Sequence, residues 1–412
     1  MIKTDNYLLF CPGPINVALN VKEATVGHDI GHREFEFEKL FKRLQNRILD
    51  VFEVQNKKEF LPIVITGSGS AANESILSSI VGNKHILTLS NGEFGERLYN
   101  ISKLHNANTS TIRQEWGKEI DVAAVKAYLS THKVDIIAMV HHETCSGMLN
   151  PVAKIGALTK KYGITFMLDA VSSAGAEKID LEKWNIAFCS TSASKALSSL
   201  SGLSLVIGRK KEFAKIKNLP KKTMYLNLYS FYDYARRLKQ TPNTPGVPLF
   251  FALDQAIANI LAIGVTKKRA QIKSHARALR TGMTEMGLKF LLDENVMSSS
   301  ITTVFVPRNV STSALKANLR KRNIIIYEGK GVFKNKVFQV ANIGEITKDQ
   351  VQYFLGELKT AMALSTITAI TKKSAAKKVT PLKGATEVPS HRPFFPQIFS
   401  LSMVRNRNTP SK

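Results

Sequence analysis

The chain has 412 residues, 44% of them hydrophobic, which is enough for a large domain and a smaller one. Its three cysteines, Cys11, Cys145 and Cys189, are too few for a disulfide framework, and their spacing indicates no zinc site. The formal net charge of +26 raises an anionic partner such as nucleic acid, although residues 361–412, with nine Lys or Arg and one Glu, account for +8 of it.

The N-terminal segment does not resemble a targeting signal. Only a short apolar stretch precedes Cys11-Pro12-Gly13-Pro14, and no window of the chain reaches membrane-spanning length. We therefore expect a cytoplasmic protein without a membrane partner. Lysine-rich surfaces are common on soluble enzymes, so the excess charge is interpreted as a solvated surface that also favours anionic substrates, and a nucleic-acid partner is not expected.

Short, continuous apolar runs alternate with helical stretches over the first 260 residues. Such runs are typical of strands buried on both faces, and they occur at 61–65, 85–89, 134–140, 164–168, 186–189 and 203–207. Helices are expected at 70–80 and at 153–162, the second ending before Gly163. The alternation predicts an α/β fold with a mostly parallel, doubly wound sheet and helices on both of its faces.

The pattern changes after Gly246. Helical stretches at 249–261 and 267–286 precede strands near 301–306, 324–327 and 337–340, with helices at about 312–320 and 348–361, which predicts a smaller α+β C-terminal domain. Beyond about Ser365, Lys, Ser, Thr, Pro and Ala dominate, a composition typical of disorder. The predicted parts are an N-terminal arm at 1–20, a large cofactor-binding domain at 21–260, a small domain at 261–365 and a basic tail at 366–412.

Three polar motifs follow predicted strands of the first domain. The turn Thr66-Gly67-Ser68-Gly69-Ser70 places backbone N–H groups and hydroxyls at a helix N-terminus, as a phosphate cradle does, although such turns about as often serve only as caps. Asp169 ends a strand at the edge where open α/β sheets bind ligands, although it could cap a helix instead. Lys195 follows the next strand, and a lone lysine is most often a solvated charge.

Together the three motifs are far more specific than any one of them. Pyridoxal phosphate needs an anion cradle, a carboxylate beside its ring nitrogen and an amine that binds it as a Schiff base, and the motifs supply these in that order. Asp169 would keep the ring nitrogen protonated, so that the ring draws electrons from the substrate. Lys195 would first bind the cofactor and then, displaced by the substrate amine, act as the general base.

Further motifs resemble the class V aminotransferases, pyridoxal-phosphate enzymes of fold type I that include alanine–glyoxylate, serine–pyruvate and 2-aminoethylphosphonate–pyruvate transaminases. The resemblance extends from about Leu8 to Leu358, and the motifs that carry it are Pro12-Gly13-Pro14, GHRE at 31–34, TGSGSAANE at 66–74, NGEFGER at 91–97, HHETCSGMLNP at 141–151, LDAVSS at 168–173, SASK at 192–195, QTPNTP at 240–245 and NIGE at 342–345. So many motifs in one order make a chance match improbable.

The resemblance assigns cofactor-binding roles by position. It implies that Ser68, Gly69 and Ser70 hold the phosphate, that Asp169 pairs with the ring nitrogen and that Lys195 carries the cofactor.

It further implies that Phe94 stacks on the ring, that Val171 packs on the opposite face and that Thr144 bonds near the ring hydroxyl, although Phe94 taken alone could be a core residue. A threonine before a proline reaches the phosphate of the neighbouring subunit in this family, and Thr244 is its counterpart, with Thr241 as the alternative. The resemblance therefore implies a homodimer with shared sites.

Different motifs resemble family members that act on different substrates. HHETCSGMLNP, YLNLYSFY and ANIGEI resemble the 2-aminoethylphosphonate transaminases, whereas GHRE resembles the alanine–glyoxylate type. Where the family usually has an arginine that clamps the substrate anion, this chain has Gln339, which carries no charge. Either another cation, such as Arg33 or Lys330, replaces it or the substrate differs; the candidate substrate-binding residues are Gly13, Arg33 and Gln339.

The sequence thus predicts an aminotransferase that moves an amino group from a small donor, first 2-aminoethylphosphonate and otherwise alanine or serine, to pyruvate or glyoxylate. A lyase or desulfurase of the same family is the alternative, but desulfurases need a mobile cysteine and none of the three falls in the C-terminal domain. A non-catalytic basic binding protein on this scaffold is a second alternative, which rests on Gln339 and the charge.

Overall fold

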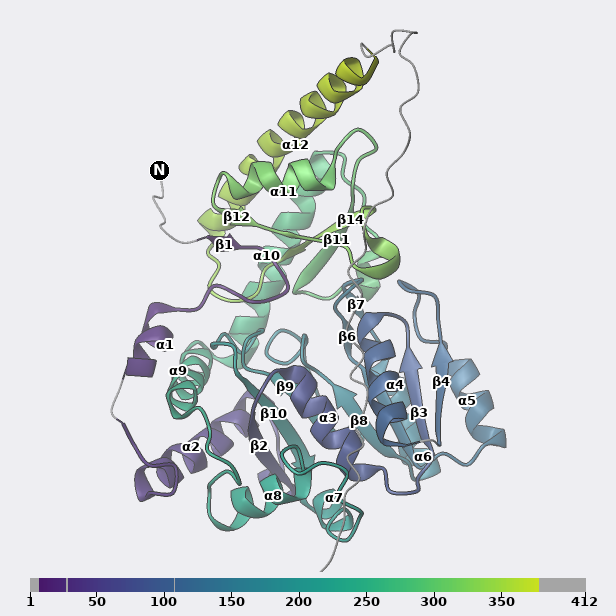
Figure 1. The fold of residues 1–412 in the computed structure, drawn as a ribbon, viewed down its shortest axis with the longest axis vertical. Helices are drawn as coiled ribbons and strands as arrows, with labels where there is room; N and C mark the ends of the chain where they lie inside the picture. Colours follow the sequence, from purple (N-terminus) through teal and green to yellow (C-terminus); the bar gives the residue numbers. More distant parts are fainter. Residues whose placement is uncertain (1–6, 27–28, 107, 378–412) are drawn as a thin grey trace, which may run out of the picture. The chain divides into compact units, whose positions relative to one another are not determined.

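The computed structural model describes residues 7–26, 29–106 and 108–377, with side chains as far as residue 366 (Figure 1). The chain divides into two compact units, Met1–Ile370 and Thr371–Lys412, and the sheets lie in the first. Helix α12 (Lys348–Lys377) continues past the predicted end at 361, because neither Gly nor Pro follows Gly356 before Pro381. The rest of the predicted tail, 378–412, lies outside the described residues.

A seven-stranded sheet has the order β2-β10-β9-β8-β5-β3-β4. Its strands are β2 (Phe60–Thr66), β3 (Ile86–Ser90), β4 (Thr109–Arg113), β5 (Ile136–Val140), β8 (Thr165–Asp169), β9 (Ile186–Ser192) and β10 (Leu203–Arg209). Only β10 runs against its neighbours, so the predicted mostly parallel sheet is confirmed. The edge strand β4 escaped prediction because its residues are polar and only half-buried rather than a continuous apolar run.

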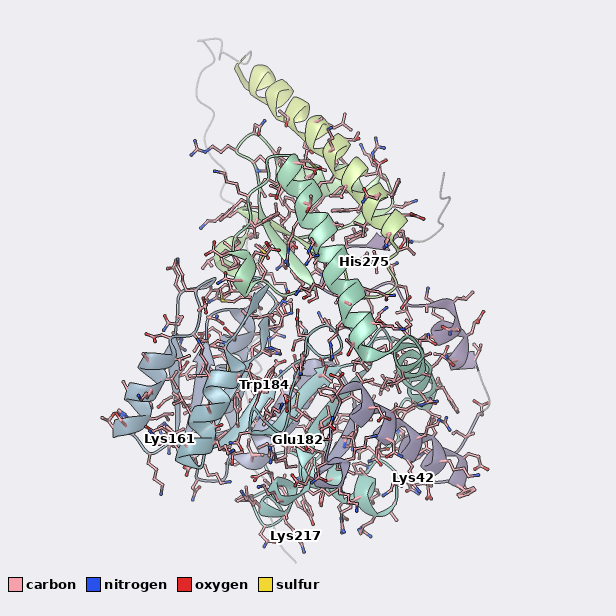
Figure 2. The ribbon with its side chains drawn as sticks, turned by 180° about the vertical axis from the view of Figure 1, so that it is seen from behind. Lys42, Lys161, Glu182, Trp184, Lys217 and His275 are labelled. Atoms are coloured by element: carbon pink, nitrogen blue, oxygen red, sulfur yellow. The ribbon has the colours of Figure 1, made fainter. Side chains whose placement is uncertain are left out.

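Helices cover this sheet on both sides, as the sequence predicted. They are α2 (Phe35–Val51), α3 (Gly69–Ile80), α4 (Glu93–His105), α5 (Val122–Thr131), α6 (Val152–Tyr162), α7 (Lys210–Lys215), α8 (Leu228–Arg237) and α9 (Val247–Ile263), preceded by the short α1 (Leu19–Glu23). Figure 1 has α3 and α4 on the near side of the sheet, and Figure 2, seen from behind, has α6 with Lys161 on its near side. Helix α6 ends where Gly163 adopts a left-handed conformation with φ 68°, which a glycine allows without strain.

The C-terminal part of the first unit forms a second core. It consists of α10 (Val265–Glu285), β11 (Ile301–Phe305), α11 (Thr312–Arg320), β12 (Ile324–Ile325), β13 (Tyr327–Glu328), β14 (Val337–Ala341) and α12. The N-terminal strand β1 (Leu8–Leu9) pairs in parallel with β12, and Leu8 and Phe10 are buried in this second core. The N-terminal arm is therefore a structural part of the C-terminal core. The predicted bounds of the domains, at residues 20, 260 and 365, stay a prediction.

Three short elements complete the fold near the sheet edge. The two-residue strands β6 (His142–Glu143) and β7 (Met148–Leu149) form an antiparallel pair directly after β5, and the 3-10 turns are Ala24–Val26, Lys57–Glu59, Glu294–Val296 and Gly331–Phe333. In the described part of the chain no single helix is long and apolar enough to cross a membrane; only α9 and α10 taken together, bent by 87°, reach that length and composition.

Exposed lysines are spread over separate elements rather than over one. Lys42 lies on α2, Lys161 on α6 and Lys217 just after α7, and all three are exposed (Figure 2).

Candidate active site

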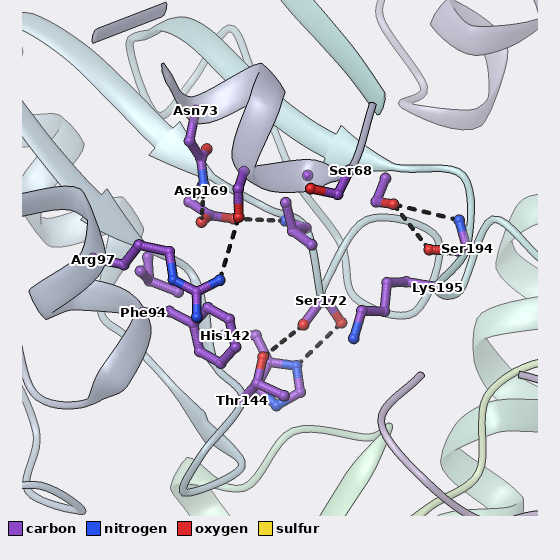
Figure 3. A pocket seen from close by; sticks show the side chains of 15 residues that line it. Ser68, Asn73, Phe94, Arg97, His142, Thr144, Asp169, Ser172, Ser194 and Lys195 are labelled. Carbon is purple, nitrogen blue, oxygen red and sulfur yellow. Dashed lines mark hydrogen bonds between the residues drawn. The ribbon is translucent and has the colours of Figure 1, made fainter. Parts of the chain in front are cut away.

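A pocket lies where the carboxyl ends of β2, β5, β8 and β9 meet at one edge of the main sheet (Figure 3). Strands that run in one direction deliver the residues after their last hydrogen bond to the same edge, which is where open α/β sheets bind ligands. The pocket is lined by eight of the residues that the sequence analysis named, Ser68, Gly69, Ser70, Phe94, Thr144, Asp169, Val171 and Lys195. The two residues on which the predicted chemistry depends, Asp169 and Lys195, thus share one pocket.

One end of the pocket is the N-terminus of helix α3. Ser68 is the N-cap, and its side chain makes no capping hydrogen bond, so it does not satisfy the first N–H groups of the helix. Uncapped N–H groups at a helix N-terminus bind anions. Only glycine fits at position 69 without a steric clash, because a Cβ there would lie 2.6 Å from Cγ2 of Val171.

Asp169 ends strand β8 and is held by two hydrogen bonds. Its Oδ1 accepts from the backbone N–H of Val171 at 2.8 Å, and its Oδ2 accepts from Nδ2 of Asn73 at 2.6 Å. Burial raises the pKa of the Asp169 carboxyl, and these hydrogen bonds together with the charges of Arg97 and Lys195 oppose the rise. Among the described residues, no cation is hydrogen-bonded to this buried carboxylate, so it suits a cationic partner.

Lys195 lies just beyond strand β9 and faces the N-terminal arm. Its Nζ donates a hydrogen bond to the carbonyl oxygen of Pro12, and a Cβ on Gly13 would lie 2.9 Å from that Nζ. The pKa of Lys195 is lowered to about 8, mainly by burial and also by the nearby charge of Lys330, against the opposing influence of Cys11 and Asp169. About a tenth of the amine is therefore neutral at pH 7, far more than for an ordinary lysine, and the neutral amine is the nucleophile.

The pocket contains residues that the sequence analysis did not assign. They are Asn73, Arg97, Val140, His142, Ser172, Ser192 and Ser194. Helical spacing could have revealed two of them, because Asn73 lies four residues after Gly69 on α3 and Arg97 lies three residues after Phe94 on α4.

Arg97 brings a positive charge to the pocket wall. Its guanidinium carbon lies 4.7 Å from the centre of the Phe94 ring, and Nη1 donates to Oγ of Ser70 at 3.2 Å. Nη2 contacts Oε1 of Glu93 at 3.3 Å. A guanidinium beside the proposed anion cradle strengthens the attraction of this end of the pocket for a phosphate.

The wall opposite α3 is formed by the segment after β5. The hydroxyls of Thr144 and Ser172 are 2.6 Å apart, and Nδ1 of His142 is 3.1 Å from the carbonyl oxygen of Ser172 (Figure 3). The pKa of His142 is lowered to about 4, mainly by burial and also by the charge of Lys195, against the opposing hydrogen bond with Ser172. The ring is therefore neutral at neutral pH, and its buried Nε2 has no hydrogen-bond partner among the described residues.

Gly13, Arg33, Gln339 and Thr244 do not line this pocket. Gly13 lies against Lys195, as described above. The guanidinium of Arg33 donates to the carbonyl oxygens of Thr241 and Pro242, at 2.6 and 3.0 Å. Thr244 is exposed on the loop before α9.

Gln339 is buried on β14, and its amide is occupied. Nε2 donates to the carbonyl oxygen of Thr144 at 2.6 Å and is 3.2 Å from both the carbonyl oxygen of Cys145 and Oγ1 of Thr303. An amide nitrogen has only two hydrogens, so no donor is left for a substrate. Sequence reasoning could not foresee these contacts, because each joins residues far apart in the chain.

The pocket fits the cofactor that the motifs predicted. The uncapped start of α3 fits a phosphate, the buried Asp169 fits a protonated ring nitrogen, and the low pKa of Lys195 fits an amine that attaches to a carbonyl carbon.

The sequence and the fold are similar to those of known proteins. The model of the family described as aminotransferase class-V matches residues 18–345. An uncharacterized aminotransferase of Methanocaldococcus jannaschii is 32% identical over 82% of this chain and 88% of its own length. A 2-aminoethylphosphonate–pyruvate transaminase of Salmonella paratyphi B is 29% identical over 87% of this chain and 98% of its own. The crystal structure of an alanine–glyoxylate aminotransferase from Nostoc sp. superposes with a TM-score of 0.82 at 25% identity, covering 87% of this chain and 96% of that one.

Proposed function

Since this chain belongs to the class V aminotransferase family, we propose that it moves an amino group from 2-aminoethylphosphonate, or otherwise from alanine or serine, to pyruvate or glyoxylate. The observation that carries the proposal is the shared pocket of Asp169 and Lys195 beside the start of α3. Pyridoxal phosphate is the cofactor, and when bound it supplies a carbonyl that takes up the amino group and a ring that draws electrons from the reacting carbon.

The chain's own residues then have separate tasks. The N–H groups of Gly69 and Ser70 bind the phosphate, with Ser68 and Arg97 beside them. Asp169 holds a proton on the ring nitrogen, because a buried carboxylate is stabilised by a cationic partner.

Lys195 provides the amine that attaches the cofactor and later moves the proton at the donor's reacting carbon. Its lowered pKa of about 8 suits both tasks, because a base works best when its pKa lies near the operating pH. Phe94 and Val171 would hold the ring from either side, and the Thr144 hydroxyl, 2.6 Å from that of Ser172, would be available to hydrogen-bond the cofactor.

We assign the anionic end of the donor to Lys330 rather than to Arg33 or Gln339. The donors of Arg33 and Gln339 are occupied by carbonyl oxygens within the chain. Lys330 is exposed, has no ion-pair or hydrogen-bond partner for its side chain among the described residues, and is near enough to Lys195 to lower the pKa of that amine. A free cation beside the reacting lysine suits a phosphonate or carboxylate.

We also propose a cytoplasmic homodimer in which Thr244 reaches the phosphate of the second copy. Thr244 is exposed, whereas Thr241 is buried and its hydroxyl donates to the carbonyl oxygen of Asn243 at 2.8 Å. The exposed threonine is therefore the better candidate of the two.

The alternatives receive less support. All three thiols are buried and burial raises the pKa of each, so none offers the accessible thiolate that a desulfurase needs. A non-catalytic binding protein is not retained, because the family is one of enzymes and because Gln339, which had supported that alternative, has a structural task.

The test is transamination with purified protein. Incubation with 2-aminoethylphosphonate and pyruvate should yield alanine, and borohydride treatment followed by peptide mass analysis should find the cofactor on Lys195. A Lys195→Ala variant should lose both. Release of ammonia or sulfide without a transferred amine would instead indicate a lyase or desulfurase, and turnover by the Lys195→Ala variant would contradict the mechanism.

The assignment of Lys330 has its own experiment. Lys330→Met should raise the KM for an anionic donor roughly tenfold with little change in kcat, because a binding charge is lost while the reacting groups remain. Lys334→Met, an exposed lysine a few residues further along, is the matched control and should leave KM unchanged.

A further inference from the structure

A buried carboxyl group lies behind the pocket, at Glu143, which is 0% exposed and does not line the pocket. Its oxygens accept hydrogen bonds from the backbone N–H of Phe94 at 3.1 and 3.3 Å, of Gly95 at 3.0 Å and of Cys145 at 3.4 Å. Phe94 and Gly95 belong to the first turn of α4, whose N–H groups have no partner within the helix. Glu143 therefore caps α4 from a distant segment.

The residue that would normally cap this helix cannot do so. Gly92 is the N-cap of α4 and has no side chain, and a Cβ there would lie 2.4 Å from Cδ and Cγ of Glu143. The carboxylate thus occupies the space of the missing side chain. A negative charge at a helix N-terminus is favourable, because it meets both the free N–H groups and the positive end of the helix dipole.

The contact of Glu143 with α4 joins two walls of the pocket. Helix α4 carries Phe94 and Arg97 into the pocket, and the segment that contains Glu143 carries His142 and Thr144 on either side of it. A shift of either segment would change the distance between the stacking ring and the hydroxyl across the pocket.

The same segment is held from its other side. Nε2 of Gln339 donates to the carbonyl oxygen of Thr144 at 2.6 Å, from strand β14 of the second core. The turn at 143–145 is therefore fixed between α4 and β14. On the α4 side it is held by Glu143 and by the backbone N–H of Glu93, which donates to Sγ of Cys145 at 3.5 Å.

We propose that Glu143 is a positioning residue that sets the spacing between Phe94 and Thr144, and so the affinity for the cofactor and the tilt of its ring. The inference rests on the proposed cofactor pocket. Burial raises the pKa of Glu143 to about 7, and the hydrogen bonds from Cys145, Gly95 and Phe94 oppose the rise.

The test is the isosteric change Glu143→Gln in the full-length protein. The amide keeps the volume but turns an N–H₂ group toward backbone N–H groups, so the cofactor dissociation constant should rise roughly tenfold. The circular dichroism that the bound cofactor shows in the visible range should change, because it reports the setting of the ring. Hydrogen exchange should accelerate at the amides of Phe94 and Gly95.

Asp121→Asn is the matched control. Asp121 caps α5 by accepting from the N–H groups of Ala123 and Ala124, so it makes the same kind of contact away from the pocket. In the Asp121→Asn variant, hydrogen exchange should be faster at the first amides of α5, while cofactor affinity and the visible spectrum should be unchanged.

Two outcomes would overturn the inference. One is a Glu143→Gln protein that binds cofactor with the affinity and spectrum of the unchanged protein; the other is exchange that accelerates equally in all helices, which indicates general destabilisation. If that variant does not fold, Glu143→Asp keeps the charge but shortens its reach, and normal binding by it would be equally contradictory. Failure of the unchanged protein to bind cofactor at all would instead refute the proposed function.

Discussion

Nδ2 of Asn73 on helix α3 donates a hydrogen bond of 2.6 Å to Oδ2 of Asp169 at the end of strand β8. The helix whose first turn forms the proposed phosphate cradle therefore also holds, one turn later, the acid proposed for the opposite end of the cofactor. Asn73 in turn accepts a hydrogen bond from the hydroxyl of Ser190 on β9, so α3, β8 and β9 are connected at one place.

Asn73→Ala should weaken cofactor binding roughly tenfold, because Asp169 would lose one of its two hydrogen bonds and its pKa would rise further. Titration of the apoprotein with cofactor measures the effect. Asn259→Ala is the control, since Asn259 makes side-chain hydrogen bonds with Asn20 at the exposed surface, and binding should not change. Equal affinities of both variants would contradict the prediction.

Gly69→Ala should reduce cofactor affinity more than tenfold while the protein still folds. The new Cβ would lie 2.6 and 2.9 Å from the two γ-carbons of Val171, so the pocket wall must move. Gly356→Ala in helix α12 has no atom within 4 Å of its new Cβ, and it should raise stability by about 0.5–1 kcal/mol without affecting binding. Thermal unfolding and cofactor titration of the two variants distinguish lost space from a general effect of alanine.

The rate of cofactor attachment should increase with pH and level off above about pH 8, where Lys195 is neutral. Below that pH the rate should fall about tenfold per unit, because only the deprotonated amine reacts. Lys330→Met removes a neighbouring positive charge that lowers the pKa of Lys195, so its profile should move to higher pH. Stopped-flow absorbance on the apoprotein gives both curves, and coincident curves would place Lys330 too far away to act on Lys195.

Acid should destabilise the fold through His141 as well as His142. Burial lowers the pKa of His141 to about 3 and that of His142 to about 4, so between these values and about 6.5 the unfolded chain binds protons that the folded chain does not. Stability contributed by each neutral histidine is complete above pH 6.5 and is lost as pH falls, by at most about 1.4 kcal/mol per unit.

The contribution of Glu143 to the pH dependence of stability has the opposite sign. Its raised pKa makes the folded chain, rather than the unfolded chain, bind the extra proton between about pH 4.5 and 7. The informative quantity is therefore the difference in the free energy of unfolding between the unchanged protein and the His141→Gln variant. Both proteins contain Glu143, so its contribution cancels in this difference. Urea unfolding from pH 4.5 to 7.5 should show a smaller loss of stability on the acid side for the variant. Parallel curves would mean that the pKa of His141 is the same in the folded and the unfolded chain.

The sequence predicted those parts of the fold that depend on local pattern. Continuous apolar runs located six of the seven strands of the main sheet, and the polar residue that ends β8 could be placed at the binding edge because parallel strands end together. Asp169 and Lys195 were therefore expected in one crevice, and they line one pocket.

Contacts between distant segments could not be predicted in this way. Arg33 and Gln339 carry donors suited to a substrate, but the carbonyl oxygens that occupy them belong to loops whose positions depend on the whole fold. Strand β4 has the polar composition of a loop, and its pairing with β3 depends on the tertiary structure. Glu143 lies inside a motif that the sequence analysis quoted, yet nothing in that motif reveals which helix it caps.

The pairing of Leu8 with Ile324 means that the C-terminal core cannot be excised as an autonomous fragment. A piece that starts at α10 would leave empty the space that Leu8 and Phe10 fill, including the stacked contact of Phe10 with Phe354 at 4.3 Å. During synthesis, strand β1 cannot pair until β12 has been made, which is near the end of the described chain. Mixing a separately produced N-terminal peptide with the shortened chain should therefore restore its stability.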